Sequence, residues 1–112
     1  MNVKKPNYLL QVAHECIINT EYAIKSLSES NSAAGSIQFM NQAFQCAKQL
    51  QQKWDLMSDV NGRFLVEQFY HQFLFANQTF LNSVENGSRE AVEQELATMR
   101  ECYTEMRDGL AD

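Results

Sequence analysis

The chain has 112 residues, of which 45% are hydrophobic and 21% charged, with only one proline and four glycines. This length suffices for one domain with its own core, and the scarcity of proline and glycine favours long helices over a fold with many turns. The formal net charge is −5 and no segment is rich in lysine or arginine. Nucleic acid is therefore not expected as a partner, because phosphate binding needs clustered cations.

The sequence predicts neither a membrane-spanning segment nor a secretory signal. No stretch approaches the roughly 18 consecutive apolar residues that cross a bilayer, and the N-terminus has no hydrophobic run ahead of a cleavage site. We therefore expect a cytoplasmic protein without membrane insertion. Cys16, Cys46 and Cys102 are odd in number and far apart. They are expected as small buried thiols and not as a disulfide framework.

The first predicted helix covers about residues 6–28 and carries one core-facing stripe at three- and four-residue steps. The stripe consists of Leu9, Ala13, Cys16, Thr20, Ala23 and Leu27. Ile18 and Tyr22, four residues apart, lie on the opposite side. After a small, polar break, the second predicted helix covers residues 33–54, and its apolar stripe is Met40, Ala43, Ala47, Leu50 and Trp54.

The third predicted helix, over residues 61–85 after a break at 55–62, is the most apolar. The stretch 61–86 holds five of the seven phenylalanines in the chain. Its predicted core face consists of Leu65, Val66, Phe69, Tyr70, Phe73, Leu74, Phe80, Leu81 and Val84. Phe64 and Phe75 fall on the back of this helix, eleven residues or about three turns apart, with Gln68 and His71 between them.

The fourth predicted helix, over residues 89–110, has a regular apolar seam and an opposite, charged side that we expect to be solvated. The seam is Val92, Leu96, Met99, Tyr103, Met106 and Leu110. Four helices of about 20 residues, each about 30 Å long and joined by short breaks, predict an all-α fold. The expected architecture is an antiparallel four-helix bundle in a single domain of residues 1–112.

The candidate catalytic and metal-binding residues do not form a recognisable site. Di-iron bundles use inward glutamates and Glu-x-x-His pairs, whereas here His14 precedes Glu15, and Glu67 stands four residues before His71 without a second ligand pair. No glycine-rich elbow presents a nucleophile, and the scattered glycines form no phosphate loop. We therefore expect no metal, no cofactor and no enzymatic activity.

Phe64 and Phe75 admit two interpretations. In the first, the third helix is covered on both sides, or the two side chains are ordinary surface residues. In the second, they line a docking groove for an amphipathic partner helix, with Ile18, Tyr22 and His71 as further candidate contacts. An exposed phenylalanine lacks the transfer free energy of about 1.5–3 kcal/mol that burial would provide. Two exposed phenylalanines at matched angular positions therefore favour a partner that covers both. A second copy of the chain is the other occupant considered, in a homodimer through this helix.

Four apolar motifs have the order and spacing found in a known family of helical bundles. They are Pro6 with Leu9 and Leu10, the segment 43–50 (AFQCAKQL), the pair Phe69-Tyr70, and the segment 99–103 (MRECY). By these residues the chain resembles the flagellar secretion chaperones of the FliS family. The spacing from Tyr70 to Tyr103 is similar to that of the family, with no insertion or deletion. The chain departs from the family pattern at three places, since His14 replaces a tyrosine, Tyr103 replaces a tryptophan and Asn61-Gly62 replaces a glycine pair. The family's longer, tyrosine-bearing N-terminal segment is also expected to be shorter here.

The resemblance implies a cytosolic helical chaperone that holds the C-terminal segment of flagellin around its outside. Such a chaperone prevents premature polymerisation and delivers its client to the flagellar type III export machinery, and it needs no catalysis. A partly disordered client loses conformational entropy on docking, which suits a reversible hand-over. The alternative function is a structural or adaptor homodimer that binds another amphipathic helix.

Overall fold

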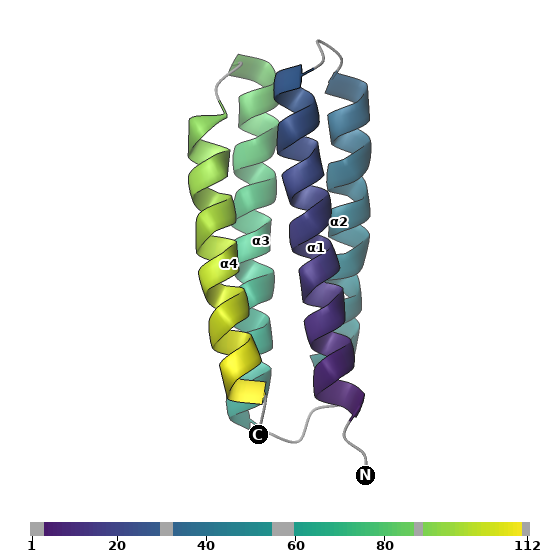
Figure 1. Ribbon diagram of the computed structural model, residues 1–112, viewed down its shortest axis with the longest axis vertical. Helices are drawn as coiled ribbons and strands as arrows, with labels where there is room; N and C mark the ends of the chain where they lie inside the picture. Colours follow the sequence, from purple (N-terminus) through teal and green to yellow (C-terminus); the bar gives the residue numbers. More distant parts are fainter. Residues whose placement is uncertain (1–3, 30–32, 55–59, 87–88, 111–112) are drawn as a thin grey trace.

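Four antiparallel α-helices lie side by side along a long axis, in an envelope of 48 × 19 × 18 Å (Figure 1). This computed structural model describes residues 4–29, 33–54, 60–86 and 89–110, and the side chains within 8–27, 34–54, 60–85 and 89–110. The helices are α1 (Lys4–Glu29), α2 (Ala33–Trp54), α3 (Val60–Asn86) and α4 (Glu90–Leu110). The predicted all-α four-helix bundle is confirmed, and the observed helix ends agree with the predicted ranges to within about one turn.

The helices pack as two tight pairs, α1 with α2 and α3 with α4, and the pairs then face each other (Figure 1). Small side chains allow the first pair to approach closely, since Ala13, Ala23, Ala43 and Ala47 are completely buried. The thiol of Cys16 in α1 donates to the backbone carbonyl of Ala43 in α2 at 3.5 Å. A side chain of one helix thus contacts the backbone of the next.

Large side chains fill the centre of the bundle. The largest that are fully buried are Phe69, Phe73, Phe80, Met40, Leu50, Met99 and Met106. The three phenylalanines come from α3 at steps of four and seven residues, which places them on one helical face. Each fully buried side chain of this size contributes about 1.5–3 kcal/mol of transfer free energy, so α3 supplies much of the core.

The predicted core face of α3 is wrong at one residue. Leu81 is 43% exposed, whereas Ala76 and Ser83, which were not predicted, are buried. The reason is that α3 packs more extensively against α4 than against α2. The helix is therefore turned toward α4, and Leu81 lies outside the buried face. The predicted break at 55–62 is also too long, because α3 begins at Val60.

Two buried hydroxyl groups form hydrogen bonds within their own helices. Thr20 Oγ1 donates to the carbonyl of Cys16 at 2.8 Å, and Ser83 Oγ donates to that of Thr79 at 3.0 Å. Each bond removes the cost of an unpaired buried hydroxyl. Over the described part of the chain, no helix has both the length and the apolar content needed to cross a membrane.

The three cysteines are free thiols. Cys16 and Cys102 are buried and Cys46 is half-buried, so the prediction of buried thiols is correct for two of the three. Burial raises the pKa of all three thiols, and the pKa of Cys16 lies well above its ordinary value because the thiolate would lose its hydration. The nearby Cys46 raises the Cys16 pKa further.

We expect the free energy of unfolding to fall as the pH rises above about 8.5, the pKa of a free thiol. In the unfolded chain Cys16 then loses its proton, whereas in the folded chain it keeps the proton to a higher pH. Its stabilising contribution is thus complete below that pH and is lost as the pH rises toward the folded pKa. Urea titrations at about pH 7 and pH 10 measure the change, with a non-thiol reductant present.

The Cys16→Ala variant is the control for this pH dependence. It lacks the titrating group, so its stability should decline less between the two pH values than that of the wild type. An equal decline in both proteins would show that the thiol does not cause the effect.

Candidate partner-binding grooves

Phe64 and Phe75 lie on the outside of the bundle, 64% and 65% exposed. The interpretation that α3 is covered on both sides is therefore wrong. Each helix of a four-helix bundle turns one face to the centre and one face outward, and these two phenylalanines belong to the outward face of α3. The remaining interpretations are surface residues without a partner and a docking surface.

A groove of about 450 Å³ runs between α3 and α4, and we call it the α3/α4 groove. Phe64 and Phe75 both line it, with His71 between them. Its remaining lining residues are Glu67, Gln68 and Gln72 from α3, and Thr98 and Cys102 from α4. Two aromatic rings three turns apart thus share one concave surface with a mixed polar and apolar floor.

Glutamine side chains of α3 bridge the bottom of this groove to α4. Gln68 Nε2 donates to Glu105 Oε1 at 2.9 Å and contacts Cys102 Sγ at 3.7 Å. Gln72 Nε2 donates to Glu95 Oε1 at 2.5 Å. Hydrogen bonds to charged groups are stronger than neutral ones, so these contacts fix the distance between the two walls. A preformed groove reduces the ordering cost of binding.

Val60 extends the outward stripe of α3 and was missed by the sequence prediction. It is 78% exposed and lies four residues before Phe64, on the same side of the helix. The four-residue step was visible in the sequence, but the predicted helix began one residue later, at 61. Thr98 and Cys102 were missed for another reason, because only the packing of α4 on α3 brings them to the groove.

His71 joins the groove to an aromatic cluster. Its ring lies 5.8 Å from that of Tyr70 and 6.5 Å from that of Trp54, at the end of α2. Trp54 meets Tyr70 edge-on at a centroid distance of 5.3 Å, a favourable geometry for an aromatic pair. The His71 side chain thus lies beside two aromatic rings and stays exposed.

Ile18 and Tyr22 line a different groove. This α1/α4 groove, of about 550 Å³, also includes Ile24, Leu96, Lys25, Glu93, Glu21 and Arg100. The structure does not bring Ile18 and Tyr22 together with the two phenylalanines, because α4 lies between the two grooves. Tyr22 instead lies beside Phe39 of α2, with ring centroids 5.4 Å apart.

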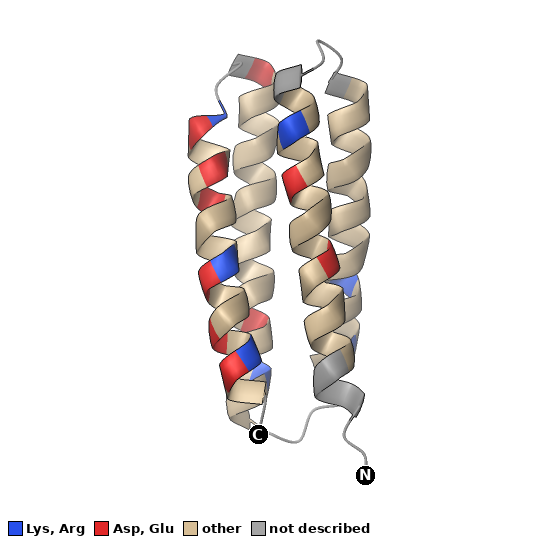
Figure 2. Cartoon of the chain, in the orientation of Figure 1, with Lys and Arg blue, Asp and Glu red and all other residues tan. Residues whose placement is uncertain are grey.

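The two edges of α4 carry different charges. Arg89, Arg100 and Arg107 follow one another at steps of eleven and seven residues, and so share one edge. That edge faces α1, since Arg100 Nη2 forms an ion pair with Glu21 Oε2 at 2.8 Å. In Figure 2 the basic positions of α4 lie on the side of α1, and most acidic positions lie on the other side.

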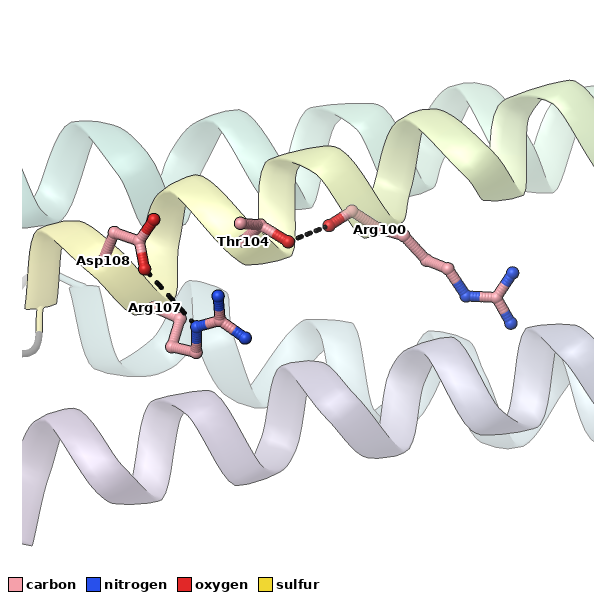
Figure 3. A network of polar contacts seen from close by, with 4 residues as sticks. All are labelled: Arg100, Thr104, Arg107 and Asp108. Carbon is pink, nitrogen blue, oxygen red and sulfur yellow. Dashed lines mark hydrogen bonds and ion pairs between the residues drawn. The ribbon is translucent and has the colours of Figure 1, made fainter.

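Short local bonds hold the exposed surface of α4 in place (Figure 3). Thr104 Oγ1 donates to the backbone carbonyl of Arg100 at 3.1 Å, and Arg107 Nε donates to Asp108 Oδ1 at 3.4 Å. The Arg100 guanidinium extends away from Thr104 (Figure 3). These are exposed contacts of small energetic value, and they leave the charges of α4 accessible to a partner.

The described residues contain no group of three or more His, Cys, Asp or Glu side chains arranged to hold a metal ion. His14, the second histidine, lies beside Tyr103 with ring centroids 6.0 Å apart. Comparisons with protein-family models, curated proteins and solved structures find no match for this chain. The resemblance to the flagellar chaperones therefore stays a prediction from the motifs.

Proposed function

We propose that this protein is a cytoplasmic export chaperone that binds an amphipathic helix of its client in the α3/α4 groove. Following the family resemblance, the client is the C-terminal segment of flagellin, held back from polymerisation until it reaches the flagellar export machinery. The observation that supports helix binding is the pair Phe64 and Phe75, both about two-thirds exposed within one groove.

These two side chains are not part of the buried core of the bundle. The core is filled by Phe69, Phe73 and Phe80 from the opposite face of α3. Covering an exposed phenylalanine with a partner recovers about 1.5–3 kcal/mol, which supplies a driving force for association. The eleven residues from Phe64 to Phe75 span about 16 Å, so a partner helix of about three turns contacts both rings.

The Phe64→Ser/Phe75→Ser variant tests this function. We expect it to keep the circular dichroism and unfolding midpoint of a folded bundle, and to bind a labelled flagellin C-terminal peptide at least about 100-fold more weakly than the wild type. Leu81→Ser is the matched control, because Leu81 is an exposed apolar residue of the same helix outside the groove. It should bind like the wild type.

Two results contradict the proposal. Unchanged peptide binding by the double variant would show that the groove is not the site. Unfolding of the double variant would show that the rings belong to the core.

A structural homodimer is the second candidate function, because the apolar stripe of Val60, Phe64 and Phe75 also suits a two-fold interface between copies. The molar mass measured by light scattering, with and without the flagellin peptide, distinguishes the two candidate functions. The chaperone function predicts a complex of chain and peptide. A stable dimer that ignores the peptide would support the second candidate and contradict the first.

A further inference from the structure

The α4 edge beside the α3/α4 groove is acidic. Glu95 and Glu105 are placed there by their bonds to Gln72 and Gln68 of α3. At 100° per residue, Glu101 and Asp108 fall near Glu105 on the same side of the helix. The arginines of α4 lie on its other edge, facing α1. Thr98 and Cys102 line the groove on the α4 side, and the α4 surface beyond them is therefore rich in carboxylates.

The α3 wall of the groove does not balance this charge. Arg63 is the single lysine or arginine between residues 60 and 86. Its Nε forms an ion pair with Oε2 of Glu67, a lining residue of the groove, at 2.8 Å. A ligand in the groove thus meets two apolar rings. On the α4 flank it meets carboxylates that bond to neutral glutamines of α3 and so keep their negative charge, whereas Asp108 is paired with Arg107.

We infer that the occupant of the α3/α4 groove is an amphipathic helix with lysine or arginine along one edge, which lies over α4. This inference rests on the proposed function and adds the chemistry and the orientation of the bound helix. Its apolar residues, spaced over about three turns, cover Phe64 and Phe75. Its basic edge faces Glu101 and Glu105.

The same charges disfavour a second copy of this chain as the occupant. The chain carries a net charge of −5, and the outward face of α3 offers no lysine. Two copies joined through this groove would leave their acidic α4 edges without opposite charges, and like charges across an interface reduce affinity. An amphipathic helix with a basic edge covers the exposed phenylalanines with its apolar face and pairs the carboxylates of α4 with its cations.

Two synthetic helical peptides of about 18 residues test the inference with the full chain. They share one leucine face and differ along one edge, which carries lysines in the first and glutamates in the second. Fluorescence anisotropy at low salt should show the lysine peptide binding at least about tenfold more tightly. The ratio should shrink toward one at about 0.5 M salt, because exposed charges are screened.

Two variants with equal charge changes locate the effect. Glu101→Gln/Glu105→Gln removes two carboxylates at the groove and should weaken the lysine peptide about tenfold while sparing the glutamate peptide. Glu21→Gln/Glu93→Gln removes two carboxylates at the α1/α4 groove and should change neither. Equal weakening by both variants would overturn the inference, because it would indicate attraction to the net charge alone.

The outcomes also separate this inference from the proposed function. If both peptides bind equally and Phe64→Ser/Phe75→Ser abolishes both, helix docking stands and the basic edge is overturned. If neither peptide binds, the inference is overturned, while the flagellin peptide titration decides the proposed function independently.

Discussion

Phe73→Ala is expected to lower the free energy of unfolding by about 3–5 kcal/mol, the largest effect among these predictions. The side chain is completely buried, and its ring centroid lies 6.1 Å from that of Phe44 in α2. Truncation removes the transfer free energy of the ring and leaves a cavity where α3 meets α2. Because a domain of this size has only about 5–15 kcal/mol of stability, urea unfolding should show a much lower midpoint.

Phe75→Ala is the matched control for this prediction. It makes the same chemical change two residues away on the same helix, at a side chain that is 65% exposed. Its effect on unfolding should stay within about 0.5 kcal/mol. Similar losses in both variants would contradict the assignment of inner and outer faces of α3, and with it the basis of the proposed groove.

Ala43→Leu is expected to destabilise the bundle by about 1–3 kcal/mol or more, through overpacking between α1 and α2. Ala43 is completely buried, and its carbonyl accepts the hydrogen bond from Cys16. A larger side chain there forces the helices apart or into strained rotamers, and it disturbs that contact as well. Thermal and urea unfolding measure the loss.

Gln42→Leu provides the comparison on the neighbouring, exposed position of α2. It introduces the same side chain without entering the core, so its stability should stay within about 0.5 kcal/mol of the wild type. An Ala43→Leu variant as stable as Gln42→Leu would mean that the α1/α2 contact tolerates volume and is not closely packed at this point.

The two grooves differ in what a partner would encounter. The α3/α4 groove presents two exposed aromatic rings beside carboxylates, whereas the α1/α4 groove is crossed by the ion pair between Arg100 and Glu21. Such an exposed ion pair is worth little to stability. A ligand entering the second groove would nevertheless have to break or accommodate it. The first groove is therefore the better site for an apolar helix.

The sequence by itself determined the helices and the inner faces. Regular three- and four-residue spacing of apolar residues is a local property of a helix, so Phe69, Phe73 and Phe80 were correctly assigned to the core. The same angular argument separated Phe64 and Phe75 from that face. The periodicity of apolar residues indicates which residues share a helical face, and this inference does not depend on the positions of neighbouring helices.

The tertiary structure alone decided which helix covers each face. The turn of α3 toward α4 exposed Leu81 and buried Ser83, although both lie near the edges of the apolar stripe. The separation of Tyr22 from the phenylalanine groove likewise depends on the position of α4 between them. The rotation and packing of each helix depend on side-chain volumes where segments distant in the sequence meet. A local sequence pattern contains no information about these contacts.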